Sequence, residues 1–263
     1  MGGEAEAGTL RHAGRARVEM NAARAVGGSP RDFASEFDDL GFQILPAVLS
    51  EADCDSLFAE LSELFARQQN SSRNRIGGLR NLLRICPQVA ALASSRPLVS
   101  LVEQAVGRSA FPVRAIFFDK TAGSNWRVPW HQNLTIAVAQ RIETAGFGPW
   151  SVKAGVVHVQ SPLEILSNMT TVRLHLDACD QNNGALQVIP RSHRHGELGA
   201  DEIGVQAGLG NSVTCELPRG GVLVMRPLLL HASSPARSPS HRRVLHFDYA
   251  CDELPNGLKW YDR

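Results

Sequence analysis

The chain has 263 residues, of which 43% are hydrophobic and 20% charged, with 27 lysines and arginines against 26 aspartates and glutamates. This length is enough for the hydrophobic core of one large domain. The net charge of +1 argues against the basic surface typical of nucleic-acid-binding proteins. No apolar run approaches the roughly 20 residues that a membrane-spanning helix needs, so we expect neither nucleic-acid nor membrane partners.

The first 31 residues are rich in alanine, glycine and arginine and contain almost no large apolar side chain. Such a segment cannot bury enough surface to offset its chain entropy. We therefore predict a disordered leader over residues 1–31 and a single ordered domain over residues 32–263. The leader has no hydrophobic segment of a secretory signal, and the five cysteines form no CxxC pair. Both features predict a cytoplasmic protein.

The first half of the domain has helical periodicity. After a short predicted strand at residues 41–45, Ser50 and Glu51 begin a helix whose apolar residues recur at spacings of three and four. A second helical region is predicted over residues 79–106, with breaks near Pro87 and Pro97. These segments predict a helical layer at the N-terminal side of the domain.

From residue 111 onward the pattern changes to short apolar, β-branched segments separated by glycine, proline and asparagine. Eight strands are predicted, at residues 111–118, 128–138, 155–160, 170–176, 185–189, 212–217, 221–230 and 243–250. Strands that follow one another without intervening helices indicate a sandwich or barrel. We predict a mainly β fold, a double-stranded β-helix (a cupin-like jelly roll) packed against the helical layer.

Histidines suggest where chemistry could occur. A non-haem Fe(II) oxygenase binds its metal through two histidines and one carboxylate and leaves the other coordination positions open. The first two ligands are separated by one intervening residue, because residues i and i+2 of a strand point to the same side. Two pairs have this spacing, His131 with Asn133 and His175 with Asp177, and His231 ends a later apolar strand. Arg242 follows eleven residues after His231, and an arginine fork suits a carboxylate.

Three stretches carry a resemblance to a known family: "FFDKTAGSNWRVPWHQNLTIAV", "LHLDACDQNNGALQVIPRSHRHG" and "GGVLVMRPLLLHASSPARSPSHRRVLHFDYA". Together they span roughly residues 111–250, in the family's order. The chain resembles the phytanoyl-CoA dioxygenase family of Fe(II)/2-oxoglutarate-dependent oxygenases. The resemblance implies Fe(II) as the metal, 2-oxoglutarate and O2 as cosubstrates, and a small organic molecule as substrate.

The resemblance also implies roles for individual residues. His131 and His231 correspond to the two iron-binding histidines, and Asn133 stands where the family has a carboxylate. Arg242 corresponds to the group that binds 2-oxoglutarate, and its neighbour on the chain should point to the opposite face of the strand. Three further candidates for cofactor binding are Ser233, Arg173 and Lys120.

Two questions stay open at the level of sequence. The first is whether His175 and Asp177, which retain the carboxylate, are the metal-binding pair instead. The second is what Asn133 does, because an amide oxygen brings no negative charge to the metal. One possibility is an oxygenase that hydroxylates an unactivated C–H bond and whose metal site is impaired or re-tuned. The other is a catalytically silent ligand-binding or sensor protein on the same fold. A cupin-like isomerase that uses no 2-oxoglutarate is disfavoured by the position of Arg242.

Overall fold

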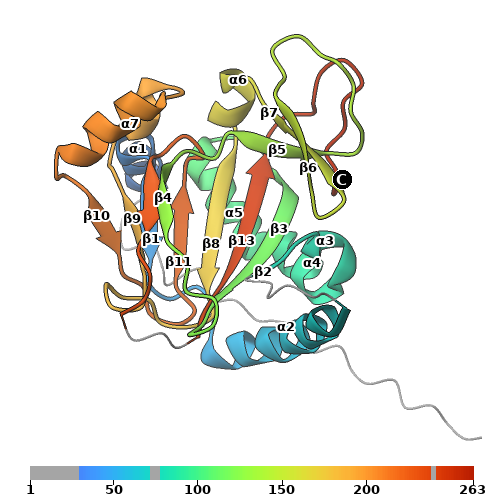
Figure 1. Ribbon diagram of the computed structural model, residues 1–263, viewed down its shortest axis with the longest axis vertical. Helices are drawn as coiled ribbons and strands as arrows, with labels where there is room; N and C mark the ends of the chain where they lie inside the picture. Colours follow the sequence, from blue (N-terminus) through green and yellow to red (C-terminus); the bar gives the residue numbers. More distant parts are fainter. Residues whose placement is uncertain (1–29, 72–77, 238–240) are drawn as a thin grey trace, which may run out of the picture.

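A computed structural model describes residues 30–71, 78–237 and 241–263 of the chain. The leader predicted over residues 1–31 lies almost wholly outside the described residues, and the first helix, α1 (Pro30–Leu40), begins at its end. All paired strands run antiparallel. The arrangement is the predicted one, a jelly roll with a layer of helices from the N-terminal part of the chain (Figure 1).

A six-stranded sheet forms the larger wall of the jelly roll. In spatial order it contains β1 (Phe42–Leu45), β11 (Val222–Met225), β8 (Thr170–His175), β13 (Arg242–Ala250), β3 (Phe111–Lys120) and β2 (Gly78–Leu79). Strand β13 lies in the middle, between β8 and β3. Neighbours in this sheet come from distant parts of the sequence, as a jelly roll requires.

A four-stranded sheet forms the smaller wall. Its order is β10 (Val213–Cys215), β9 (Leu186–Val188), β12 (His231–Ser233) and β4 (Val128–His131). One hydrophobic cluster joins the two walls, because Leu186, Val188 and Cys215 of the smaller sheet pack with Leu223 and Met225 of the larger one. The space between the walls is therefore apolar at this end.

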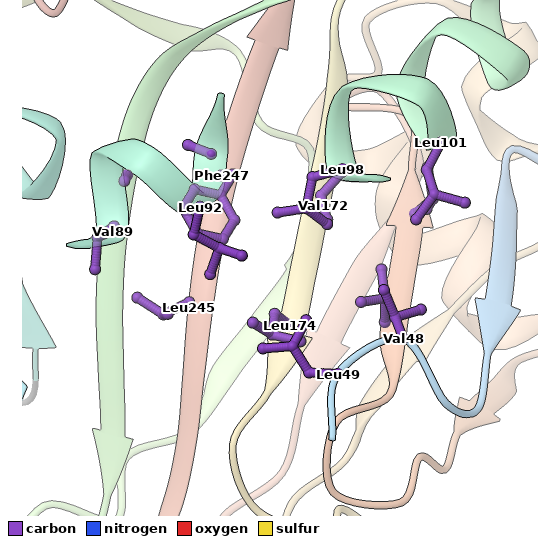
Figure 2. Close-up of a cluster of buried hydrophobic side chains, with 14 of the residues drawn as sticks. Val48, Leu49, Val89, Leu92, Leu98, Leu101, Val172, Leu174, Leu245 and Phe247 are labelled. Carbon is purple, nitrogen blue, oxygen red and sulfur yellow. The ribbon is translucent and has the colours of Figure 1, made fainter. Parts of the chain in front are cut away.

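Helices cover the outer face of the larger sheet. They are α2 (Glu51–Ser71), α3 (Leu82–Ile85), α4 (Pro87–Ala93) and α5 (Arg96–Val106). Figure 2 shows Leu92, Leu98 and Leu101 from the helices beside Val172 and Phe247 from the sheet. This packing is the predicted helical layer, and α4 and α5 each begin where a proline interrupts the second helical region.

A smaller third sheet stands apart from the two walls. It contains β5 (Thr135–Val138), β7 (Val156–Gln160) and β6 (Trp150–Lys153), and it has its own hydrophobic cluster with the buried Trp260. The remaining elements are α6 (Leu163–Ser167), the short 3₁₀ helix Ser192–His195 and α7 (Ala200–Gly208). No helix among the described residues is long and apolar enough to cross a membrane.

Two predicted strands are wrong in extent. The segment 128–138 is two strands in different sheets, β4 and β5, because the chain leaves the smaller wall between them. At that point the Gln132 side chain donates to the backbone carbonyls of Gly196 and Leu228, and the backbone N–H of Asn133 donates to the Pro227 carbonyl. The segment 221–230 likewise ends as a strand at Met225.

Removal of a buried side chain from the sheet should test the core. Leu174 of β8 is fully buried against the helices, so Leu174→Ala should lower the free energy of unfolding by about 2–5 kcal/mol. Leu209 is 62% exposed, and Leu209→Ala is the matched control. The measurement is urea denaturation of both variants. An equal loss of unfolding free energy in the two would contradict this packing.

Candidate active site

The two histidines predicted as metal ligands lie side by side on adjacent strands of the smaller sheet. His231 of β12 is the direct pairing partner of His131 of β4, and their ring centroids lie 4.1 Å apart. His131 Nδ1 is 2.9 Å from the Pro129 carbonyl oxygen, and His231 Nδ1 is 2.8 Å from that of Leu229. Because a carbonyl can only accept, both Nδ1 atoms carry the proton, and both Nε2 atoms keep a free lone pair.

Burial lowers the pKa of both imidazoles, and for His231 it does so strongly, with a smaller contribution from the charge of His131. Both rings are therefore neutral near pH 7. A neutral imidazole whose Nδ1–H is held by a backbone carbonyl is the usual state of a histidine that binds a metal through Nε2.

Asn133 lies two residues beyond His131, just outside β4. The side chain of the intervening Gln132 is fixed by three hydrogen bonds, since its Nε2 donates to two carbonyl oxygens and its Oε1 accepts from the Leu198 amide. The Asn133 Nδ2 atom is buried and has no hydrogen-bond partner in the part of the chain that the structure describes. Nowhere in residues 30–71, 78–237 and 241–263 do three His, Cys, Asp or Glu side chains form a metal-binding group. The donors that the structure brings together at this position are thus the two imidazoles of His131 and His231.

A buried cationic cluster lies at the end of the larger sheet, on its inner face. Arg242 and Lys120 are direct partners across β13 and β3. Lys120 Nζ donates to Ser233 Oγ at 2.9 Å and to the Ser234 carbonyl at 3.0 Å, and Arg242 donates to the Gly184 carbonyl. A Cβ at Gly184 (φ +82°) would lie 2.6 Å from the Ser234 carbonyl oxygen, so only glycine fits there. The cluster brings together three candidates that sequence analysis named separately.

Arg173, the fourth predicted cofactor-binding residue, is oriented by a chain of buried groups. Its Nη1 lies 3.1 Å from His246 Nδ1, and since arginine can only donate, this nitrogen accepts. His246 Nε2 therefore carries the proton and donates to Asp248 at 3.1 Å. Asp248 also accepts from Thr171 at 2.7 Å and from Arg114 at 2.6 Å.

Charges explain the protonation states in this chain of groups. Burial acts to raise the pKa of Asp248, but the charge of Arg114 and the hydrogen bonds from His246 and Thr171 outweigh it and hold that pKa well below its ordinary value. Burial lowers the pKa of His246, which keeps the ring neutral. Burial, and after it the charge of Arg242, lowers the pKa of Arg173 to about 10, so its guanidinium is still charged near neutral pH.

The alternative pair, His175 and Asp177, does not converge on one point. Asp177 lies on the outer side of the sheet, where one of its oxygens accepts from the Arg243 backbone at 2.8 Å and from Arg243 Nε at 2.6 Å, and the other accepts from Arg243 Nη2. His175 is 1% exposed and lies in β8 two residues from Arg173, where the charges of Arg173 and Arg242 act on its ring. The arrangement therefore favours His131 over His175 as the metal-binding position.

Sequence reasoning missed His246, Asp248 and Arg114. The available signal was the alternation along the last strand, because residues 242, 246 and 248 point to one face if Arg242 does. Arg243, expected on the opposite face from Arg242, binds Asp177 and lies over the Phe58 ring, 3.7 Å from its centroid.

The model of the family described as "Phytanoyl-CoA dioxygenase (PhyH)" matches residues 37–244. The chain belongs to this family. No curated protein sequence matches the chain. Among solved structures, the EctD protein of S. alaskensis with bound Fe is 18% identical over 92% of this chain and 88% of its own, with a TM-score of 0.68. The same protein solved with 2-oxoglutarate and 5-hydroxyectoine gives 18% identity, 90% and 84% coverage and a TM-score of 0.66.

The carbocyclase SnoK from nogalamycin biosynthesis, described as non-haem and alpha-ketoglutarate-dependent, is 14% identical over 91% of this chain and 88% of its own, with a TM-score of 0.67. Such likenesses show the jelly-roll fold of this family. Fold and family together indicate an Fe/2-oxoglutarate-dependent oxygenase. The unprotonated Nε2 atoms of His131 and His231 fit a divalent metal, and the buried cations fit a carboxylate. Two imidazoles alone make this fit incomplete, because the described residues add no third His, Cys, Asp or Glu side chain to them.

Loss of the Asp248 charge should destabilise the protein. Asp248→Asn leaves the partly buried Arg114 guanidinium without its anion, and breaking a buried pair costs about 3–5 kcal/mol. Asp39→Asn is the control, because the exposed pair of Asp39 with Arg191 should contribute at most about 1 kcal/mol. Equal midpoints of urea denaturation for the two variants would contradict a structural role for Asp248.

Proposed function

We propose that the protein is an Fe(II)/2-oxoglutarate-dependent dioxygenase that hydroxylates an unactivated C–H bond of a small organic substrate. The observation that carries this proposal is the pair of neutral imidazoles, His131 and His231, which lie side by side on adjacent strands with the proton on Nδ1 and Nε2 unprotonated. They stand in a jelly roll whose opposite wall presents buried cations and whose family is that of the phytanoyl-CoA dioxygenases.

Each polar residue of the site has a task in this proposal. His131 and His231 hold the iron, with Asn133 as the third donor. Arg242 and Lys120, the latter bonded to Ser233, bind the carboxylate of 2-oxoglutarate that is remote from the metal, and Arg173 faces the rest of the cosubstrate. When bound, iron, 2-oxoglutarate and O2 supply the oxidising power, and the protein orients the reactants and excludes water.

Asn133 sets the metal affinity in this proposal. A carboxylate contributes both a donor oxygen and a negative charge that offsets the metal, whereas an amide contributes the oxygen alone. Even groups that only orient a ligand change metal affinity or activity by about 10–100-fold, so the change of a ligand itself should weaken iron binding at least as much. The site is thus impaired or re-tuned.

The second candidate function is a catalytically silent ligand-binding or sensor protein on the same fold. Two observations favour it: the amide at position 133, and buried cations that require an anion but no metal. The cytoplasmic location and the absence of nucleic-acid and membrane partners stay predictions from composition.

Decarboxylation of 2-oxoglutarate by the iron-loaded, unmodified protein separates the two candidates, because a silent binding protein does not turn it over. Restoring the carboxylate then tests the role of Asn133. We expect Asn133→Asp to bind Fe(II) at least about tenfold more tightly, and to show faster 2-oxoglutarate decarboxylation and a stronger charge-transfer band under anaerobic conditions. Asn256→Asp, at an exposed turn, makes the same chemical change elsewhere and should have no effect. If Asn133→Asp changes neither affinity nor turnover, while His175→Ala abolishes metal binding and His131→Ala does not, the assignment of the ligands is wrong.

The affinity for 2-oxoglutarate should depend on the charge of Lys120. Burial, and after it the charges of Arg242 and Arg173, lowers the pKa of Lys120 to about 8. The protonated form, present below that pH, attracts the carboxylate, so affinity should fall as pH rises from 7 to 9, by up to about tenfold per pH unit. In calorimetric titrations Lys120→Met should flatten this profile, whereas Lys153→Met, an exposed lysine of β6, should leave it intact. An unchanged slope in Lys120→Met would refute the role of this ammonium group.

A further inference from the structure

A cavity of about 530 Å³ lies on the outer face of the larger sheet, between α2 and the end of β3 and beside the start of β13. Phe58 and Phe65 of α2 and Phe117 of β3 line it. Because successive residues of a strand point to opposite faces, the cavity lies on the other side of the sheet from Lys120 and Arg242. Sites for small molecules usually have volumes of about 300–1,000 Å³, with mostly apolar walls and a few polar groups.

The aromatic rings of the cavity are held in place, but two of them are only partly covered. Phe65 and Phe117 meet edge to face, with ring centroids 6.1 Å apart and an interplanar angle of 81°. Phe58 has the Arg243 guanidinium 3.7 Å from its ring centroid. Phe58 and Phe65 are half-buried, so each leaves part of its ring as apolar surface that a ligand can cover.

Asp119 supplies the negative charge of the cavity. The residue is only 6% exposed, and it lines the same space as the three rings. Within the described ranges its side-chain hydrogen-bond donor is His241, whose Nδ1 lies 2.9 Å from one carboxylate oxygen and 3.1 Å from the other. A carboxylate can accept about four hydrogen bonds. Asp119 therefore keeps acceptor capacity for a ligand.

The charges around Asp119 favour a cation as that ligand. Its pairing partner across the two strands is Arg243, but the Arg243 guanidinium donates to both oxygens of Asp177. Two carboxylates thus stand beside one guanidinium on this face of the sheet. As far as the structure describes the chain, the ion pair of Asp119 is with His241, whose side chain is 61% exposed.

The helical wall of the cavity adds an unpaired polar group. Ser62 Oγ is buried and has no hydrogen-bond partner in the described part of the chain, and Ser62 lines the cavity. A hydroxyl oxygen can accept a hydrogen bond as well as donate one. The cavity thus offers acceptors for N–H groups on its sheet wall and on its helix wall, with aromatic rings between them.

We propose that this cavity binds a small organic ammonium with an aromatic or otherwise apolar body, its charge against Asp119 and its body against the three phenylalanine rings. The faces of aromatic rings also attract cations, so body and charge both favour this class of ligand. The inference does not rest on the proposed function, because none of these side chains lies on the inner face of the jelly roll. The interior, with its buried cations, should repel the same ligand.

The test is calorimetric titration of the full chain with three probes that share one apolar body: phenethylamine, 2-phenylethanol and 3-phenylpropionate. Near neutral pH the first is a cation, the second is uncharged and the third is an anion. We expect phenethylamine to bind at least about tenfold more tightly than 2-phenylethanol, which is about 1.4 kcal/mol. The anion should show no binding that depends on Asp119.

Two variants locate the binding. Asp119→Asn should weaken phenethylamine at least about tenfold and leave 2-phenylethanol unchanged, whereas Asp201→Asn, at an exposed carboxylate of α7, should match the unmodified protein. Ala66→Phe places a ring at the cavity wall and should abolish binding of the amine. Ala91→Phe makes the same change at an exposed alanine of α4 and should not. Thermal unfolding checks that each variant is folded.

Three results would overturn the inference: no binding of phenethylamine, equal affinities for phenethylamine and 2-phenylethanol, or binding of the amine that persists in Ala66→Phe. Whether the iron-loaded protein turns over 2-oxoglutarate decides none of them. A failure of the proposed oxygenase activity and a failure of this inference can therefore be told apart.

Discussion

The alternation of side chains along β13 is the constraint on which the rest of this molecule depends. One face of the strand carries Leu245, Phe247 and Tyr249, which pack into the core beneath the helices. The other face carries Arg242 together with His246 and Asp248, which point into the jelly roll. Because β13 pairs with both β3 and β8, its register fixes the positions of Lys120 and Arg173 as well. A slip by one residue would exchange core and site.

Electrostatics inside the jelly roll are unbalanced in one direction. Asn133, two residues after His131 in the sequence, carries no charge, and the inner face of the larger sheet carries the buried cations Lys120, Arg173 and Arg242. Burial in a region of low dielectric makes each uncompensated charge costly. Stability and ligand binding are therefore coupled here, since an anion that enters the interior satisfies groups that the folded chain leaves unpaired.

Much of this arrangement could be predicted from the sequence. The change from helical to strand periodicity near residue 111 correctly predicted a helical layer followed by a jelly roll. The spacing of His131, His231 and Arg242 indicated a metal and cosubstrate site, which stays a prediction. The break after His131 was not predictable, because it depends on contacts of Gln132 with the distant residues Gly196 and Leu228. The grouping of Arg173 with His246 was also out of reach, since it depends on which strand lies beside β13.

The most direct measurement is anomalous scattering from crystals of the unmodified protein grown with Mn(II) and 2-oxoglutarate. We expect one metal peak in contact with the Nε2 atoms of His131 and His231, and electron density for a carboxylate against Arg242 and Lys120. A metal peak at His175, or a dicarboxylate bound away from the inner face of the larger sheet, would contradict the assignment of this site.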